Sequence, residues 1–130
     1  MINNLYSKKV MEHFMHPKNM GKIKNPSGVA TVGNPYCGDV MRLYLKIEKK
    51  DGKEYIKDVK FQTLGCAAAI STSSIMTSMV KGKPLDKAKK ITNAVITEAL
   101  GGLPAIKTHC SVLAAEALEK AIENYQKKSK

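Results

Sequence analysis

The sequence predicts an α+β protein: a small antiparallel three-stranded sheet with helices packed on one face, an N-terminal helix and a long C-terminal helix. Three observations support this fold class. Apolar and polar residues alternate over residues 41–48, which is typical of a strand with one face on the core. Asp-Gly at residues 51–52 predicts a hairpin turn. From Gly65 onward the apolar spacing is helical, and strands followed by helices favour helices packed on the sheet.

The first element is predicted to be a short helix. Its apolar residues recur at helical spacing and are Leu5, Tyr6, Val10 and Phe14. Asparagines at residues 3–4 are candidate caps, and the helix should end before His16-Pro17. Residues 17–28, rich in Pro, Gly, Asn and Lys, are expected to form a connecting loop. A first strand is predicted over residues 28–33.

A β-hairpin should follow this strand. The residues expected to face the core are Met41, Leu43, Leu45 and Ile47. Those expected to face water are Arg42, Tyr44, Lys46 and Glu48. Beyond the turn, a weaker alternation marks the returning strand through Tyr55, Val59 and Phe61.

The rest of the chain is predicted to be helical. Residues 64–80 carry no charge, but these 17 residues include six hydroxyl side chains, so they predict a buried central helix rather than a membrane span. Short helices are expected over 85–91 and 94–100, the second ended by Gly101-Gly102. The last helix, over 110–125, should bury one stripe and pair Glu116 with Lys120; the stripe is Ala114, Leu118, Ile122 and Tyr125.

Length and composition indicate a single domain over residues 1–130, with residues 127–130 as a flexible tail. No signal-peptide pattern is seen, so we expect a cytoplasmic protein that does not associate with membranes.

The net charge is +11, yet of 22 basic residues only Arg42 is arginine. Nucleic-acid readers rely on the planar guanidinium group, so nucleic-acid binding is not favoured. The lysine excess instead favours association with acidic proteins.

The three cysteines carry the main chemical signal. Cys37, Cys66 and Cys110 each stand at the edge of a predicted element, and the last two stand at predicted helix starts, where the helix dipole favours the reactive thiolate. An odd number of cysteines with no secretory signal argues against disulfides. Free cysteines are often small buried hydrophobes, but three at element boundaries, with Asp39 and His109 beside them, favour a metal centre. Sulfur ligands suit zinc and iron–sulfur centres alike.

Three sequence blocks strongly resemble the U-type iron–sulfur cluster assembly scaffolds, the IscU/NifU N-terminal family. The resemblance covers nearly the whole chain, and the order of the blocks makes it specific. The blocks are residues 33–39 (Gly-Asn-Pro-Tyr-Cys-Gly-Asp), 64–74 (Leu-Gly-Cys-Ala-Ala-Ala-Ile-Ser-Thr-Ser-Ser) and 103–111 (Leu-Pro-Ala-Ile-Lys-Thr-His-Cys-Ser).

The resemblance implies an assembly scaffold and carrier rather than an enzyme. Such a scaffold receives persulfide sulfur from a cysteine desulfurase, takes up iron, builds a [2Fe–2S] cluster and passes it to apo-proteins. Cys37, Cys66 and Cys110 would be cluster ligands, with Asp39 or His109 as the fourth. Cys110 would also accept the persulfide sulfur. Asp39 would keep the cluster labile, and Lys107 would assist beside the site unless it is a plain surface lysine.

Two departures from the family pattern bear on partners. Residues 103–107 read Leu-Pro-Ala-Ile-Lys where many members read Leu-Pro-Pro-Val-Lys, which weakens the element that an Hsp70-type chaperone recognises. The chain also lacks the insertion typical of zinc-bearing sulfur acceptors and retains His109, which favours the cluster-building branch. The alternative function is a zinc-bound sulfurtransferase-type partner of a desulfurase, because the same ligands could hold zinc tetrahedrally. The purified protein could still carry zinc. A ferredoxin is a further partner that the resemblance implies, and the oligomeric state, monomer or homodimer, stays open.

Overall fold

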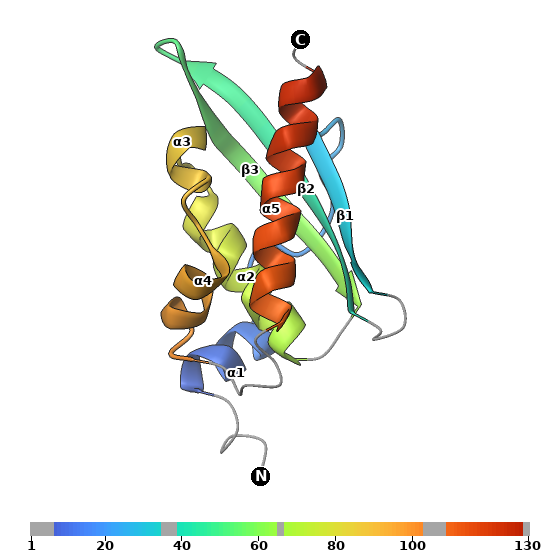
Figure 1. Ribbon diagram of the computed structural model, residues 1–130, viewed down its shortest axis with the longest axis vertical. Helices are drawn as coiled ribbons and strands as arrows, with labels where there is room; N and C mark the ends of the chain where they lie inside the picture. Colours follow the sequence, from blue (N-terminus) through green and yellow to red (C-terminus); the bar gives the residue numbers. More distant parts are fainter. Residues whose placement is uncertain (1–6, 35–38, 65–66, 103–108, 129–130) are drawn as a thin grey trace.

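The computed structural model describes residues 7–34, 39–64, 67–102 and 109–128 (Figure 1). The predicted α+β class is confirmed. In chain order the elements are α1 (Lys8–Met15), β1 (Gly28–Asn34), β2 (Asp39–Lys50), β3 (Lys53–Leu64), α2 (Ala67–Val80), α3 (Leu85–Ala88), α4 (Asn93–Ala99) and α5 (His109–Lys128).

The sheet is antiparallel with the strand order β1-β2-β3, as predicted. Helices α2 and α5 pack against one of its faces, and α1 and α4 pack on these helices in turn (Figure 1). The four core residues predicted on β2 are all buried. On the other face Tyr44 is also buried, contrary to expectation, and its hydroxyl donates to Gln62 Oε1 at 2.8 Å.

An irregularity in β3 explains its weak alternation. Lys46 pairs with Asp58 but Ile47 pairs with Ile56, so one extra residue is accommodated between the two pairs. Such a bulge moves the following side chains to the opposite faces of the strand. The core position predicted for Tyr55 is therefore taken by Ile56, which is fully buried. The turn at Asp51-Gly52 is confirmed, and both residues have positive φ, as a two-residue hairpin of type I′ requires.

Helix α1 begins at Lys8, later than the apolar periodicity from Leu5 to Phe14 predicted. Its cap is Ser7, whose Oγ accepts from Val10 N at 3.2 Å, and not the asparagines at 3–4, which lie outside the described residues. The helix ends at Met15, before His16, as predicted. The segment after it is more ordered than a simple loop, because Phe61 N donates to Asn19 O and Gly21 N donates to Phe61 O, at 2.9 and 2.8 Å.

The C-terminal helix packs closely on the sheet. Its predicted apolar stripe is confirmed, with Ala114, Leu118 and Ile122 buried, and Glu116 lies 3.3 Å from Lys120. The helix continues through Lys128, so residues 127 and 128, expected in a flexible tail, form its last turn. Lysines are favoured there because the helix dipole places negative charge at its C-terminal end. Helix α3 is shorter than the predicted 85–91 and ends at Ala88.

Candidate functional site

The predicted site residues divide into two groups. Asp39 is the first residue of β2, and His109 and Cys110 are the first two residues of α5. Cys37, Cys66 and Lys107, together with the side chains of Asp39, His109 and Cys110, lie outside the described part of the chain. The structure therefore describes the framework from which the three cysteine segments emerge.

That framework gathers at one end of the molecule. Asn34, the last residue of β1, pairs with Asp39, the first of β2, so the segment that contains Cys37 joins two neighbouring strand ends. The next residue of β2, Val40, pairs with Leu64, the last of β3. Helix α2 begins at Ala67, one residue after Cys66. Figure 1 shows these strand ends and the starts of α2 and α5 at the same lower end.

The helix starts provide positive electrostatic potential at this end. Cys110 lies in the first turn of the 20-residue helix α5, which has no acidic residue in that turn. The first turn of α2 likewise has none. Unpaired backbone N–H groups and the helix dipole favour anions at such positions, and a thiolate is an anion. Thiolates bind soft metals and attack electrophilic sulfur.

Exposed apolar side chains surround the same end. Leu64 is 73% exposed at the end of β3, Met15 is 63% exposed at the end of α1, and Val112 is 48% exposed near the start of α5. Single exposed apolar residues are ordinary, but several around one end of a small domain are typical of a surface that contacts another protein.

Hydroxyl groups of α2 hold α1 in place beside this end, a role that the sequence did not predict. Ser71 Oγ donates to Val10 O at 2.6 Å, and Ser74 Oγ accepts from Lys18 N at 2.8 Å. Ser74 Oγ also lies 2.7 Å from His13 Nδ1. Partial burial lowers the pKa of His13 below its ordinary value of 6.5. The positive charges of Lys18 and Lys9 also lower this pKa, whereas the negative charge of Glu12 raises it. The uncharged, hydroxyl-rich sequence of residues 64–80 was the available signal.

Within the residues that the structure describes, no group of three or more His, Cys, Asp or Glu side chains could hold a metal ion. The predicted ligand side chains all lie outside that set. Among the described helices, none combines the length and hydropathy needed to cross a bilayer.

Comparison with known proteins identifies the family of this chain. The model of the NifU-like N terminal domain matches residues 5–130. The chain is 56% identical over 125 residues to iron–sulfur cluster assembly scaffold protein IscU 1 of Archaeoglobus fulgidus, which covers 96% of this chain and 79% of the relative. It is 45% identical over 120 residues to the scaffold protein IscU of Aquifex aeolicus, which covers 92% of this chain and 75% of the relative.

A solved structure shares the fold. The N-terminal part of a nitrogen-fixing NifU-like protein from Brucella abortus superposes with a TM-score of 0.71 at 20% identity, covering 98% of each chain. The family resemblance predicted from the three sequence blocks is thus confirmed. From its sequence blocks, its sheet with helices on one face and its relatives, the chain belongs to the NifU-like N-terminal domain family of U-type scaffolds.

Proposed function

We propose that this protein is the scaffold on which a [2Fe–2S] cluster is built from iron and desulfurase-derived sulfur before transfer to apo-proteins. One observation carries the proposal: the end of β1, the start of β2, the end of β3 and the starts of α2 and α5 meet at one end of the molecule. Cys37 is two residues from Asp39, and Cys66 is two residues from Leu64. A two-residue segment spans at most about 7 Å, so neither cysteine can lie far from that end.

In this proposal Cys110 receives the sulfur. Its thiolate attacks the outer sulfur of the desulfurase persulfide, a new S–S bond forms on Cys110, and the desulfurase cysteine leaves as its thiolate. Its position in the first turn of α5 supports this role because the helix dipole favours the attacking thiolate. The exposed side chains of Leu64, Met15 and Val112 would contact the incoming desulfurase.

The proposed ligand set also explains why the cluster would be handed on. Cys37, Cys66 and Cys110 supply three thiolates, and Asp39 or His109 supplies the fourth ligand. Four thiolates hold iron–sulfur clusters firmly, whereas a carboxylate or an imidazole is a harder ligand for iron that already carries sulfide. Incomplete sulfur ligation therefore suits a carrier that releases its cluster. Lys107 would assist beside the site.

The test is anaerobic reconstitution with iron and sulfide, followed by visible absorption and metal analysis. We expect a [2Fe–2S] chromophore that a chelator removes readily, and we expect Cys37→Ser, Cys66→Ser and Cys110→Ser each to abolish or strongly weaken it. Met15→Ser, at the same end but outside the ligand set, is the matched control. A normal cluster in two of the three cysteine variants would contradict the ligand assignment.

The same experiment separates the alternative function. A zinc-bound sulfur acceptor would use the same ligands, since thiolates with one N or O ligand form tetrahedral zinc sites. Such a protein would retain one zinc per chain after reconstitution and show no visible absorption. The retained His109 and the absent insertion favour the scaffold.

Further partners follow from the proposed role. Apo iron–sulfur proteins would receive the cluster, and a ferredoxin would supply electrons for assembly. The Leu-Pro-Ala-Ile-Lys element at residues 103–107 lacks the second proline, so an Hsp70-type chaperone would bind it weakly. Reduced thiols are needed throughout, which fits a reducing compartment such as the cytoplasm.

A further inference from the structure

A groove lies on the helical face, away from the sheet. It has a volume of about 680 Å³ and runs between α5 and the end of α3 with the connector to α4. Its base is apolar, because Ala88, Leu118 and Ile122 line it and are buried. Val112, which is 48% exposed, lines it near the start of α5.

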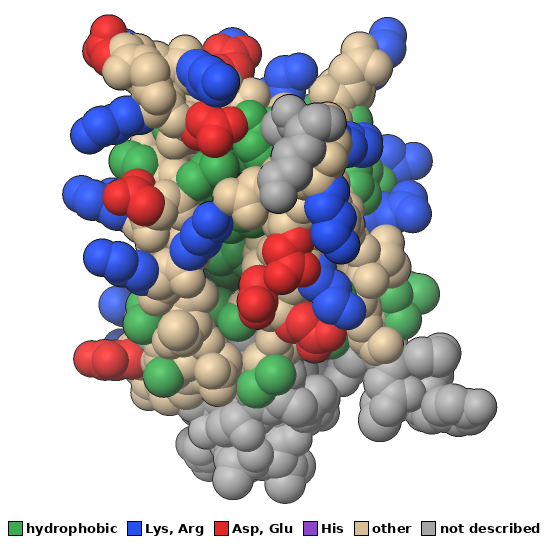
Figure 2. Space-filling model, turned by 45° about the horizontal axis from the view of Figure 1, so that its top comes forward, with side chains coloured by type: hydrophobic (Ala, Val, Ile, Leu, Met, Phe, Trp, Pro, Cys, Tyr) green, Lys and Arg blue, Asp and Glu red, His purple; other side chains and the backbone are tan. Residues whose placement is uncertain are grey.

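One rim of the groove is acidic, although the protein as a whole is strongly basic. Three exposed glutamates of α5 line it, Glu116, Glu119 and Glu123, against a single lining lysine, Lys89. The whole chain has 22 basic and 11 acidic residues. Glu116 pairs with Lys120, whereas no ion pair of Glu119 or Glu123 is seen within the described residues. Figure 2 shows acidic side chains gathered beside a hollow in which hydrophobic side chains are visible.

The lining does not favour a small polar ligand. Small-molecule sites combine an apolar pocket with a few polar groups that converge on the ligand. In the described part of the chain, every buried side-chain nitrogen or oxygen already has a hydrogen-bond partner, so none is left aimed into the groove. The polar groups at the groove are instead side chains along its rim, the three carboxylates of α5 together with Lys89, Thr92, Asn93 and Gln126.

The shape of the groove fits a helix. Its lining residues on α5 extend from Val112 to Gln126, which at 1.5 Å per residue is about 21 Å, the length of a helix of about 14 residues. Amphipathic helices bind such grooves through apolar side chains spaced one turn apart. The three glutamates recur at intervals of three and four residues, so they can meet cationic side chains on successive turns of that helix.

We propose that this groove binds a basic amphipathic helix of a partner protein, with its apolar face on Leu118 and Ile122 and its lysines or arginines beside Glu119 and Glu123. A second copy is disfavoured because two chains of charge +11 repel each other. The proposal does not depend on the iron–sulfur chemistry. Because Val112 lines the groove, one end of the bound helix would lie near the start of α5.

The first test uses a synthetic peptide of 14 residues with leucines on one helical face and lysines on the other. Fluorescence anisotropy measures its affinity, and a peptide with glutamates in place of the lysines is the control. We expect the lysine peptide to bind and become helical, with amide NMR shifts confined to residues 88–93 and 112–126. Equal affinity for the glutamate peptide, or shifts centred elsewhere, would overturn the proposal.

Charge reversal supplies the second test with a matched control. Glu119→Lys with Glu123→Lys should weaken binding of the lysine peptide about tenfold or more, because two attractive contacts become repulsive. Glu12→Lys with Glu98→Lys alters the net charge equally at exposed positions outside the groove and should leave the affinity unchanged. Equal losses in both pairs would show that only net charge matters and would overturn the site. Self-association of the wild type that Glu119→Lys with Glu123→Lys abolishes would assign the groove to a second copy instead.

Discussion

Asp39 has two candidate roles, cluster ligand and turn cap, which predict different results for its substitution. As a hard ligand it would keep the cluster exchangeable. We therefore expect Asp39→Ala to form the cluster normally but to transfer it more slowly to an apo-ferredoxin. If Asp39 only caps the turn before β2, the substitution should cost about 1 kcal/mol of stability and leave transfer unchanged. Measuring the transfer rate and the thermal midpoint on the same variant separates these outcomes.

Gly28 is required by the close approach of β1 to α5. A Cβ atom at this position would clash with Ala121 O and would lie 3.0 Å from Tyr125 Cβ. Because the obstacle is helix backbone, Gly28→Ala should destabilise the protein by about 1–3 kcal/mol, measured by urea unfolding. Thr31→Ser is the control, because it lies at an exposed position of the same strand and keeps the hydroxyl that accepts from Arg42 Nε at 3.0 Å. An unchanged midpoint for Gly28→Ala would show that α5 shifts away at no cost.

At the residue scale, candidate ligands can be proposed from short motifs, whereas contacts between distant residues cannot. The three cysteines with Asp39, Lys107 and His109 follow from motifs that short segments carry. The role of Ser74 toward His13 does not, because 61 residues separate the partners and no local pattern links them. The same holds for Gly28, whose need for a small side chain arises from a helix 93 residues further along the chain.

At the scale of elements, α1 is fastened to α2 by buried hydroxyl groups. Ser71→Ala removes the hydrogen bond to Val10 O, which should cost about 1 kcal/mol and raise amide hydrogen exchange in α1. Ser78→Ala is the matched control, because Ser78 lies on the same helix but its Oγ donates to Ser74 O within that helix at 2.9 Å. Equal exchange in the two variants would show that the Ser71 hydrogen bond does not stabilise α1.

The same junction should respond to pH. Burial lowers the pKa of His13 below 6.5, so the folded state favours the neutral ring. The unfolded chain then binds more protons below pH 6.5, and stability should fall as the pH drops from there through the folded-state pKa. Thermal midpoints at pH 7.5 and 5.5 should differ less for His13→Gln than for the wild type. His16→Gln, at an exposed position just beyond α1, is the control, and an unchanged pH dependence in His13→Gln would contradict this linkage.

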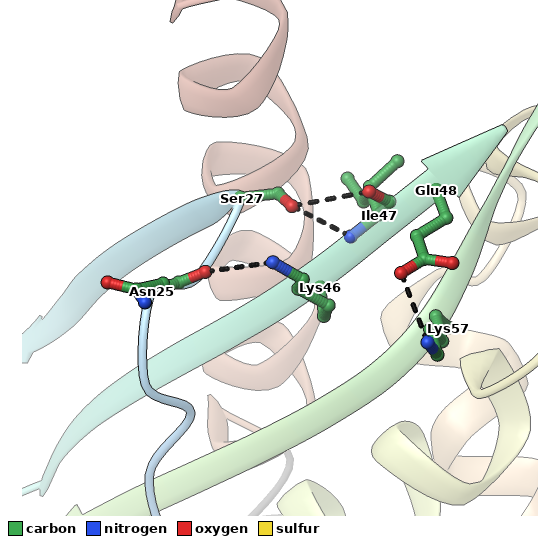
Figure 3. Close-up of polar contacts among 6 residues, drawn as sticks. All are labelled: Asn25, Ser27, Lys46, Ile47, Glu48 and Lys57. Carbon is green, nitrogen blue, oxygen red and sulfur yellow. Dashed lines mark hydrogen bonds and ion pairs between the residues drawn. The ribbon is translucent and has the colours of Figure 1, made fainter.

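Element types were predictable, whereas some of their details depend on tertiary packing. The alternation on β2 is local, so its strand and its core face were correct. The bulge in β3 required knowledge of the partner strand, so Tyr55 was assigned the place of Ile56. Figure 3 shows how the strands are joined across that region: Ser27 Oγ accepts from Ile47 N at 2.9 Å, Lys46 reaches Asn25 O, and Lys57 pairs with Glu48. None of these contacts has a sequence signature.

At the scale of the whole molecule, the layer order follows from the succession of strands and helices, but surface shape does not. The groove lies between α5 and the segment from Ala88 to Asn93, which are far apart in the sequence and line it together. From the sequence, Glu119 and Glu123 are simply polar residues of an amphipathic helix. Their position beside an apolar base becomes visible in the folded chain, and so does the contrast with the surrounding lysines (Figure 2).

The net charge of +11 should govern how fast and how tightly acidic partners bind. Exposed charges are screened beyond about 8 Å at physiological ionic strength, so association with a cysteine desulfurase should weaken as salt rises. Titration calorimetry at 50 and 300 mM KCl tests this, with trehalose at matched osmolality as the control for non-ionic effects. A dissociation constant that stays the same at both salt concentrations would mean that the apolar contacts of Leu64, Met15 and Val112, rather than the lysines, determine this association.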